Sequence, residues 1–381
     1  MEYKKINELT AVVTGGTPST RKNEYWDNGD IPWLQSGCCQ NCDVDSTEKY
    51  ITKEGYNNSS THMMSADTVM IALTGATAGK VGYLKFEACG NQSITGILPC
   101  ESLNQRYLFF YLLSQREKIL ADCVGGAQAH ISQSYVKNMT IPILAIKEQE
   151  QIVGELTKLS NIVSLRQEEI QQLDNLVKAR FVEMFGDPRS NPFGFEKKRL
   201  KDTCKVITGN TPSRAIEEYY GDYIEWIKTD NIVSGILNPT QATESLSEKG
   251  MNVGRTVEKD SILMACIAGS IASIGRVCIT DRTVAFNQQI NAVVPEQYNI
   301  LFLYVLFQMS KDYLVEDINM ALKGILSKSK LEEKEFIIPP MDLQEQFSDF
   351  VKQVDKSKVA VQKALDETQI LFDSLMQKYF G

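Results

Sequence analysis

The chain has 381 residues, 43% of them hydrophobic, which is enough for two domains that each bury a core. Its formal net charge of −8 argues against a protein that wraps nucleic acid by itself, because phosphate binding usually appears as a basic excess. The charge leaves three possibilities open: DNA is not the partner, the basic residues gather on one face, or other subunits supply much of the phosphate contact. No segment approaches the roughly 18 apolar residues of a membrane span, and the first residues lack a secretory signal, so we expect a cytoplasmic protein.

Nine cysteines occur with irregular spacing, which favours reduced thiols over a disulfide framework. Cys39 and Cys42 form a C-x-x-C pair, but a structural zinc site needs a second pair of ligands. Neither His62 nor His130 stands in such a pair. We therefore predict a loop with thiols here and no metal site.

In chain order, residues 1–147 mix short β-branched runs, glycine turns and one apolar helix near 103–120, a pattern typical of an α+β domain. A long helix is predicted over 148–186, because this segment contains no proline. Glycines and prolines then follow each other closely and break any helix, so residues 187–195 are predicted to be a linker.

The second half repeats this plan after about 195 residues, a period that indicates a duplicated domain. A second α+β domain is predicted over 196–342, with its apolar helix near 299–315, and a second long helix over 343–381. Matching motifs follow in the same order in both halves. VVTGGTPS corresponds to VITGNTPS, GDIPW to GDYIEW and LFFY to LFLY, the dipeptide NQ occurs in both, and the halves end with MFG and YFG. We expect the matched aromatic residues to be core; they are Trp33 with Trp226, Phe109 with Phe302, and Tyr111 with Tyr304.

Both long helices carry a heptad stripe of mostly apolar residues. A pseudo-two-fold axis between the halves would make the helices antiparallel, so we predict an antiparallel coiled coil; packing of each stripe on its own domain is the alternative. Arg166, Arg180 and Lys358 lie on the stripe, where they either bridge across it or extend toward a partner. The stripe positions are Ile152, Leu156, Leu159, Val163, Arg166, Ile170, Leu173, Val177, Arg180 and Met184, and Phe347, Val351, Val354, Lys358, Val361, Leu365, Thr368, Phe372, Leu375 and Tyr379.

The ordered set of motifs, present twice and followed each time by a long helix, resembles the specificity subunits of type I restriction–modification enzymes. It comprises TGGTPS and TGNTPS, GDIPW, the run MIALTGATAGKVG at 70–82, and NQSI at 91–94. The resemblance covers essentially the whole chain. It implies that each domain, which we call a head, is a target-recognition domain that reads one half of a bipartite DNA sequence.

The resemblance also implies that the helix pair spaces the heads and binds two copies of an adenine methyltransferase subunit, to which restriction subunits can be added. S-adenosylmethionine, ATP and Mg²⁺ would then be used by partner subunits, with no cofactor on this chain. Such partners would also supply the phosphate contacts that the acidic charge leaves unexplained. The turn at 75–81 and the loop at 125–132 differ between the copies, so we expect the heads to read different half-sites.

Three segments imitate catalytic motifs, and we interpret each as structural. The glycine turn at 75–81 lacks the spacing and the Ser or Thr of a phosphate loop. The sequence Asn191-Pro192-Phe193 lacks the second proline of a methyltransferase motif, and Asp187 with Glu196 and Lys198 lies around a linker. We expect a non-catalytic chain. The alternatives are a single-chain DNA methyltransferase or nuclease, and a coiled-coil scaffold without DNA specificity.

Base readout requires Arg, Lys, Asn or Gln in bidentate reach of base edges, and loops on a rigid head are the best places for them. The candidates in the first head are Arg21, Lys22, Gln35, Ser36, Lys80, Gln128 and His130, and those in the second are Arg214, Lys228, Thr229, Asn231, Arg276, Lys323, Lys328 and Lys330. The Asn-Gln pair occurs in both heads, so it is more consistent with a turn cap than with sequence readout.

Overall fold

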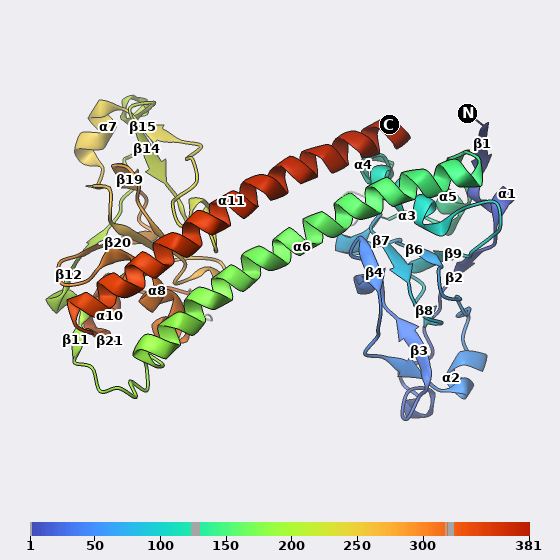
Figure 1. The fold of residues 1–381 in the computed structure, drawn as a ribbon, viewed down its shortest axis with the longest axis horizontal. Coiled ribbons are helices and arrows are strands. Elements are labelled where there is room, and N and C mark those ends of the chain that lie inside the picture. The colour runs from blue at the N-terminus through green and yellow to red at the C-terminus, as the bar shows by residue number, and fades with distance from the viewer. Residues whose placement is uncertain (1, 123–129, 317, 319–323) are drawn as a thin grey trace. The chain divides into compact units, whose positions relative to one another are not determined.

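The computed structural model describes residues 2–122, 130–316, 318 and 324–381. It divides into two compact units (Figure 1): unit 1 contains Met1–Arg166 and Ala364–Gly381, and unit 2 contains Gln167–Lys363. Each unit therefore holds one head together with a stretch of both long helices. This division differs from the expected one, in which each helix formed a separate segment, because each head packs on both helices.

The head of unit 1 is built on a five-stranded sheet with the order β2-β9-β6-β7-β4. A smaller sheet, β5-β3-β8, carries the tryptophan motif, and β1 pairs with β10. The strands are β1 (Glu2–Lys5), β2 (Val12–Thr14), β3 (Ile31–Leu34), β4 (Cys42–Val44), β5 (Tyr50–Ile51), β6 (Val69–Ala72), β7 (Val81–Leu84), β8 (Cys89–Gly90), β9 (Ile94–Ile97) and β10 (Thr140–Ile143). The helices are α1 (Ile6–Leu9), α2 (Lys53–Asn57), α3 (Gln105–Ser114), α4 (Arg116–Ala121) and α5 (Gln133–Asn138), with 3-10 turns η1 (Asn23–Tyr25), η2 (Ser36–Cys38) and η3 (Gly75–Thr77).

The head of unit 2 repeats this arrangement with a four-stranded sheet, β12-β20-β17-β18, and a second sheet, β13-β15-β14-β19-β16. The strands are β11 (Lys197–Arg199), β12 (Cys204–Thr208), β13 (Tyr220–Gly221), β14 (Ile224–Ile227), β15 (Ser245–Leu246), β16 (Thr256–Val257), β17 (Ile262–Ala265), β18 (Val277–Ile279), β19 (Val284–Phe286), β20 (Ile290–Pro295) and β21 (Glu335–Ile337). The helices are α7 (Glu248–Val253), α8 (Ile300–Met309), α9 (Lys311–Val315) and α10 (Lys328–Glu333), with turns η4 (Leu200–Asp202), η5 (Glu217–Tyr219), η6 (Thr229–Asn231) and η7 (Ile271–Ser273). The predicted α+β class is confirmed in both heads.

The apolar helix of each head is placed by the same pair of polar contacts. Asn104 caps α3 and Asn299 caps α8, each accepting from two backbone amides. The backbone N–H of each of these asparagines donates to a glutamine at the start of a long helix, Gln149 at 2.8 Å and Gln344 at 2.9 Å. Both glutamines are buried, so each head is tied to its own long helix by a satisfied polar contact.

These caps correct the register between the two apolar helices. With Asn104 equivalent to Asn299, Phe302 corresponds to Tyr107 and not to Phe109, so LFFY and LFLY are offset by two residues. The matched aromatics are nevertheless buried, including Phe109, Tyr111 and Tyr304, as are Trp33 and Trp226. The prediction that they form the core is therefore confirmed, although the pairings of Phe109 with Phe302 and of Tyr111 with Tyr304 were wrong.

The long helices are α6 (Ile146–Phe185) and α11 (Met341–Phe380). Along the central stretch 161–178 of α6, every predicted stripe position is less exposed than the residues on either side, apart from Leu173, whose neighbour Asp174 is also partly buried. In unit 1, Arg166 donates to the carbonyl oxygen of Ala364 and to Thr368, and Tyr379 donates to Glu155 at 2.5 Å. Residue numbers rise on one helix as they fall on the other, so the two stretches run antiparallel. Coiled-coil packing of the pair stays a prediction.

The same relation holds in unit 2, where Lys358 forms an ion pair of 2.5 Å with Asp174. Lys358 also donates to the carbonyl oxygen of Gly235 in the head, at 3.1 Å. Arg180 instead pairs with Glu183 on its own helix, at 2.8 Å. Arg166 and Lys358 therefore form polar contacts between the helices, whereas Arg180 reaches the other helix only through its guanidinium, which lies 5.9 Å from the ring centroid of Phe350.

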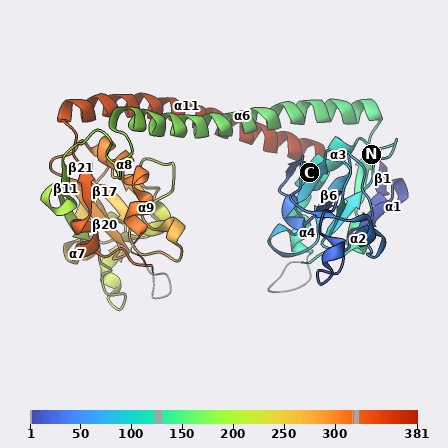
Figure 2. The same ribbon diagram turned by 90° about the horizontal axis from the view of Figure 1, so that it is seen from below.

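The ends of the helices lie against the heads (Figures 1 and 2), and their last aromatic residues, Phe185 and Phe380, are buried. In unit 1, Phe380 at the end of α11 packs on Tyr107, with ring centroids 5.2 Å apart. In unit 2, Phe185 packs on Phe302 at 4.9 Å and on Phe347 at 5.5 Å. At its start each stripe packs on its own head, the alternative that we considered: Ile152 and Leu156 lie in the core of the first head, and Phe347 and Val351 lie in that of the second. Within the described ranges, none of the helices combines the length and apolar content that a membrane span requires.

Candidate DNA interface

Each head contains a frame built from the repeated motifs. The Thr17 hydroxyl donates to Gln92 at 2.6 Å, and Thr211 makes the same hydrogen bond to Gln288. The Asn91 side chain accepts from the Ser93 backbone N–H at 3.1 Å, so it caps the turn, as we predicted for the shared pair. The frame is therefore structural, and it fixes the loops that surround it.

A glycine is required in this frame because two backbones meet there. At Gly15 an added Cβ would lie 2.1 Å from the carbonyl oxygen of Asn91, and at Gly209 it would lie 2.1 Å from that of Asn287. Contacts this short are impossible for a side chain. The first glycine of TGGT and TGNT is therefore a packing requirement that both heads share.

The tryptophan of each frame is buried and held by one hydrogen bond. Trp33 donates its indole N–H to the carbonyl oxygen of Gly16 at 3.0 Å, and Trp226 donates to that of Asn210 at 3.3 Å. A second aromatic ring meets each indole edge-on: Trp26 at 5.0 Å in the first head, and Tyr220 at 6.1 Å in the second. The two heads thus present the same aromatic platform.

In the first head this platform lines an open cavity of about 740 Å³. Polar side chains surround the two indoles, among them Thr20, Gln35, Glu48 and Lys49. Gln35 is exposed and follows directly after β3. Among the first-head candidates that the structure describes, Gln35 is therefore the one that lines the cavity.

In the second head, charged side chains gather at the same platform. Arg214 lies over the rings of Tyr220 and Trp226, at 4.7 and 5.3 Å, and Lys228 lies over Trp226 at 5.2 Å. Glu244 accepts from both cations, from Arg214 at 2.7 Å and from Lys228 at a shorter distance. The Lys228 ammonium, together with Arg214, lowers the pKa of the Glu244 carboxyl below its usual value, so this group is ionised at neutral pH. The structure thus brings two predicted candidates together around a carboxylate.

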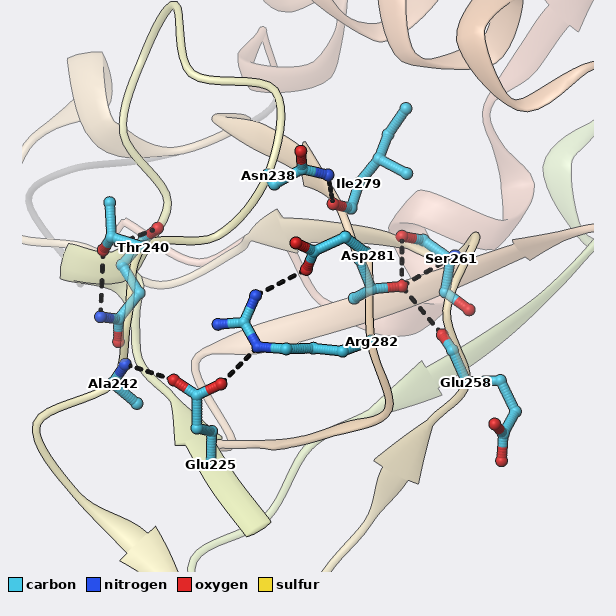
Figure 3. Close-up of polar contacts among 11 residues, drawn as sticks. Glu225, Asn238, Thr240, Ala242, Glu258, Ser261, Ile279, Asp281 and Arg282 are labelled. Atoms are coloured by element: carbon cyan, nitrogen blue, oxygen red, sulfur yellow. Dashed lines mark hydrogen bonds and ion pairs between the residues drawn. The ribbon is translucent and has the colours of Figure 1, made fainter.

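The loop that leads to Glu244 is held by hydrogen bonds to residues of neighbouring strands (Figure 3). Asn238 donates to the carbonyl oxygen of Ile279 at 2.8 Å, and the Ala242 backbone N–H donates to Glu225 at 2.8 Å. Glu225 in turn forms an ion pair with Arg282, which lowers the pKa of the Glu225 carboxyl. Glu244 is therefore presented from a backbone with fixed hydrogen bonds, which suits a recognition site.

A second group of candidates lies on the turn between β6 and β7 and its counterpart. Gly79 and Gly275 have φ of 73° and 78°, conformations that favour glycine, so both turns depend on glycine at this position. Lys80 follows Gly79 and donates to Gln40 at 2.6 Å. Arg276 follows Gly275 and donates to the carbonyl oxygen of Thr229 at 3.3 Å. In the second head this turn therefore touches η6, directly after Lys228.

One candidate is corrected by the structure. Asn231 is 7% exposed, and its amide donates to Thr240 and to the carbonyl oxygen of Gln241 while accepting from the Lys228 backbone N–H. With both ends of the amide engaged and buried, Asn231 holds the loop in place and has no free edge for a base. Sequence alone did not separate a buried asparagine from an exposed one.

The other candidates are scattered. Arg21 is exposed, and Lys22 bonds Tyr25 at 2.9 Å. Ser36 begins η2, and exposed His130 pairs with Thr74 in an isolated β-bridge. Lys328 and Lys330 lie on α10, where Lys328 pairs with Glu332 at 3.5 Å. Gln128 and Lys323 lie outside the described residues.

Several residues at the platform were not among the candidates, among them Thr20, Lys49 and Glu244. Thr20 was available from the repeat, because it stands where Arg214 stands after the shared TPS. Lys49 and Glu244 were not, because the loops that precede them differ in length and sequence between the heads. Only the backbone pairing of the folded heads makes these two positions equivalent.

No group of three or more metal-binding side chains exists among residues 2–122, 130–316, 318 and 324–381. The eight cysteines in these ranges are free thiols. Burial raises the pKa of the Cys266 and Cys278 thiols to about 12, so they are protonated and unreactive in the folded state.

Unit 2 also contains a charged cavity of about 380 Å³ between its helix stretches and its head, lined by Asp174, Arg276, Asp355 and Lys358 among others. Burial raises the pKa of the Asp355 carboxyl, Lys358 opposes this shift, and Asp174 adds to it. The ionised form of Asp355 is therefore disfavoured in the folded state.

Asp355→Asn is expected to stabilise unit 2 at neutral pH and not in acid. A carboxyl whose pKa is raised by folding contributes stability below its unfolded pKa of about 4, and this contribution is lost as pH rises through the folded pKa. The gain in unfolding free energy of the variant should grow between about pH 4 and 7 to a few tenths of a kcal/mol, because Asp355 is only partly buried and solvent screens its charge. Urea denaturation at both pH values measures it, and an equal difference at both would contradict the assignment.

The family model described as "Type I restriction modification DNA specificity domain" matches the chain twice, over residues 1–175 and 192–368. The MjaIX type I restriction enzyme specificity subunit of Methanocaldococcus jannaschii is 25% identical over 405 residues, covering 99% of this chain and 92% of the relative. The EcoR124I/EcoR124II specificity subunit of Escherichia coli is 32% identical over 169 residues, 43% of this chain and 42% of the relative. The fold matches the crystal structure of a type I restriction–modification S subunit from M. genitalium with a TM-score of 0.61 and 16% identity, covering 100% of this chain and 96% of that one.

Two tandem specificity domains, each completed by stretches of two long helices, define a DNA-recognition class of protein. The chain belongs to the family of specificity subunits of type I restriction–modification enzymes.

Proposed function

We propose that the chain reads a bipartite, asymmetric DNA sequence, with one half-site for each head. The observation that carries this proposal is a shared frame with different side chains at its platform: the Thr–Gln bond and the buried indole recur, while the first head presents Gln35 and the second presents Lys228. Two equal frames suit two similar docking modes on DNA. Unequal side chains on them suit different base pairs.

We further propose that the long helices bind two copies of an adenine methyltransferase subunit, to which restriction subunits are added. Large apolar side chains remain exposed at positions that repeat: Leu176 and Leu371 are 47% and 50% exposed, and Ile146 and Met341 are 38% and 42% exposed. Exposed apolar residues in matching places on both helices suit two copies of one partner.

In this proposal the chain itself is not an enzyme. S-adenosylmethionine, ATP and Mg²⁺ are bound and used by the methyltransferase and restriction subunits. Those subunits also supply much of the phosphate contact, which accounts for a DNA-reading chain with a net charge of −8.

The test is a methylome. The chain and the methyltransferase encoded beside it are expressed together in a host without DNA methylation, and modified adenines are mapped by long-read sequencing. We expect a split, asymmetric motif that is absent when the methyltransferase is expressed alone. A complex that assembles and binds S-adenosylmethionine but gives no motif dependent on this chain would contradict the proposal and favour a scaffold.

Leu176→Asp combined with Leu371→Asp is expected to weaken binding of the methyltransferase at least tenfold, because each aspartate places an unpaired charge in an apolar contact. Both side chains are half exposed, so the fold should be unaffected. Isothermal titration of the purified subunits measures the loss. Ile236→Asp is the matched control, since Ile236 is 46% exposed but lies on a loop of the second head. Equal affinities for the double variant and the wild type would exclude this surface.

A further inference from the structure

Three positions around the repeated tryptophan carry different charges in the two heads. At two of them the first head has a neutral side chain and the second head a basic one. At the third the first head has a lysine and the second a glutamate. The pairs are Thr20 with Arg214, Gln35 with Lys228, and Lys49 with Glu244.

Backbone hydrogen bonds establish that these positions are equivalent. Trp33 donates its backbone N–H to the carbonyl oxygen of Lys49 at 2.9 Å, and Trp226 donates to that of Glu244 at 3.1 Å. Lys49 and Glu244 therefore occupy equivalent positions next to the strand that carries the tryptophan. The sequence repeat did not show this equivalence, because the loops that join Trp33 to Lys49 and Trp226 to Glu244 have different lengths.

The other two pairs follow in the same way. Gln35 and Lys228 each accept the first backbone bond of the 3-10 turn that follows the tryptophan strand, at 2.9 and 3.0 Å. Thr20 and Arg214 each follow the serine of the TPS motif, whose carbonyl oxygen accepts a bond of 3.2 Å in the first head and 3.1 Å in the second. The three positions thus surround one site in each head.

In the second head the three side chains form a single cluster that remains accessible. The exposed fractions of the Arg214, Lys228 and Glu244 side chains are 57%, 26% and 35%. Arg214 bonds Glu244 through one terminal nitrogen, which leaves other N–H groups of its guanidinium free to donate. The cluster therefore offers donors and a carboxylate acceptor side by side on an aromatic platform.

This combination matches one base pair in the major groove. Guanine presents two acceptors, O6 and N7, which Arg or Lys reads, and cytosine presents the N4 amino donor, which Glu reads. Gln35, in contrast, has the amide that pairs with the N6 and N7 edge of adenine. The two platforms are therefore complementary to different base pairs.

We propose that Arg214, Lys228 and Glu244 make the second head read a G·C base pair, and that Thr20, Gln35 and Lys49 give the first head a different preference at the corresponding position. This proposal rests on the proposed function, since it assigns bases to heads that read DNA. Glu244 acts as a discriminator, because a carboxylate beside the bases repels the acceptor that A·T places where cytosine has its amino group.

The experiment uses the complex of the full chain with its methyltransferase. The wild-type methylome first identifies both half-sites. Binding is then measured by fluorescence anisotropy on duplexes in which single G·C pairs of the second half-site are replaced by A·T. The variants are Arg214→Thr and Lys228→Gln, which install the side chains of the first head, and Glu244→Gln. Thermal melting of each variant confirms that it is folded.

For the wild type we expect one G·C replacement to weaken binding about 5- to 150-fold, the range for one bidentate base contact. In Arg214→Thr or Lys228→Gln this penalty should fall below about threefold, and Glu244→Gln should relax it while the preference at the first half-site stays unchanged. Lys249→Gln is the matched control: Lys249 also pairs with a glutamate of this head, Glu218 at 2.5 Å, but both side chains are 70% exposed and lie outside the cluster. It should change the affinity for all duplexes equally.

An undiminished penalty in both Arg214→Thr and Lys228→Gln would overturn this assignment while the proposed function stands. A second half-site without any discriminated G·C pair would overturn it as well. A wild-type complex that yields no split motif dependent on this chain would overturn both proposals together.

Discussion

Insertion of one heptad into both long helices is expected to move the two half-sites apart by about three base pairs. Seven helical residues add about 10.5 Å, and B-DNA rises about 3.4 Å per base pair. The insertions belong after Arg166 in α6 and after Lys363 in α11, where each helix passes from one compact unit to the other. A copied heptad preserves the stripe at both places, because the stripe repeats every seven residues.

The methylome of the variant complex measures the gap directly. Both half-sites should be unchanged, since each head keeps its own helix stretches. Insertion into α6 alone is the control: it shifts one stripe past the other and should separate Lys358 from Asp174 or Arg166 from Thr368, with loss of activity. An active double insertion with the original gap would show that the helices do not set the spacing.

Phe347→Ala is expected to lower the free energy of unfolding of unit 2 by about 3–5 kcal/mol, the usual cost of removing a fully buried aromatic ring. Phe347 has no exposed surface, and it packs on Phe181 and Phe185 at 5.5 Å and on Phe302 at 6.4 Å. The cluster joins both long helices to the second head. A cavity here therefore weakens the attachment of the head as well as its core.

Hydrogen exchange followed by mass spectrometry separates the two units. Peptides from the second head should lose protection in Phe347→Ala, while those of the first head keep theirs. Val359→Ala is the control on the same helix, because Val359 is 63% exposed and should change stability by less than about 0.5 kcal/mol. Equal loss of protection in both heads would mean that the units unfold as one.

Residues that follow a local or periodic rule were predictable. The long helices were predictable because an uninterrupted heptad pattern without proline is typical of a long α-helix. They begin at Ile146 and Met341, two residues before the expected starts. The turn at Gly79 and the cap at Asn91 follow from short-range backbone geometry that the same residues produce in both heads. Family membership followed from the order of these local motifs.

The candidate site was only partly predictable. Arg214 and Lys228 were identified as basic residues on loops. Asn231, which lies on the same loop as Lys228, is buried, and its side-chain amide is engaged in hydrogen bonds within that loop. Glu244 was missed because the loop that precedes it differs in length and sequence from its counterpart, so the repeat does not align it with Lys49. Its role depends on the two cations that surround it, which the chain brings near only through the pairing of β14 with β15.

By itself, the sequence determined that the chain is duplicated, that each copy is an α+β head followed by a long helix, and that the two helices carry matching stripes. These properties depend on periodicity and on residues close together in the chain. Only the tertiary structure decided that the end of α11 belongs to the compact unit of the first head, and that the platforms carry different charges at equivalent positions. These depend on contacts between distant segments, where loops of unequal length meet at a register set by backbone hydrogen bonds and burial.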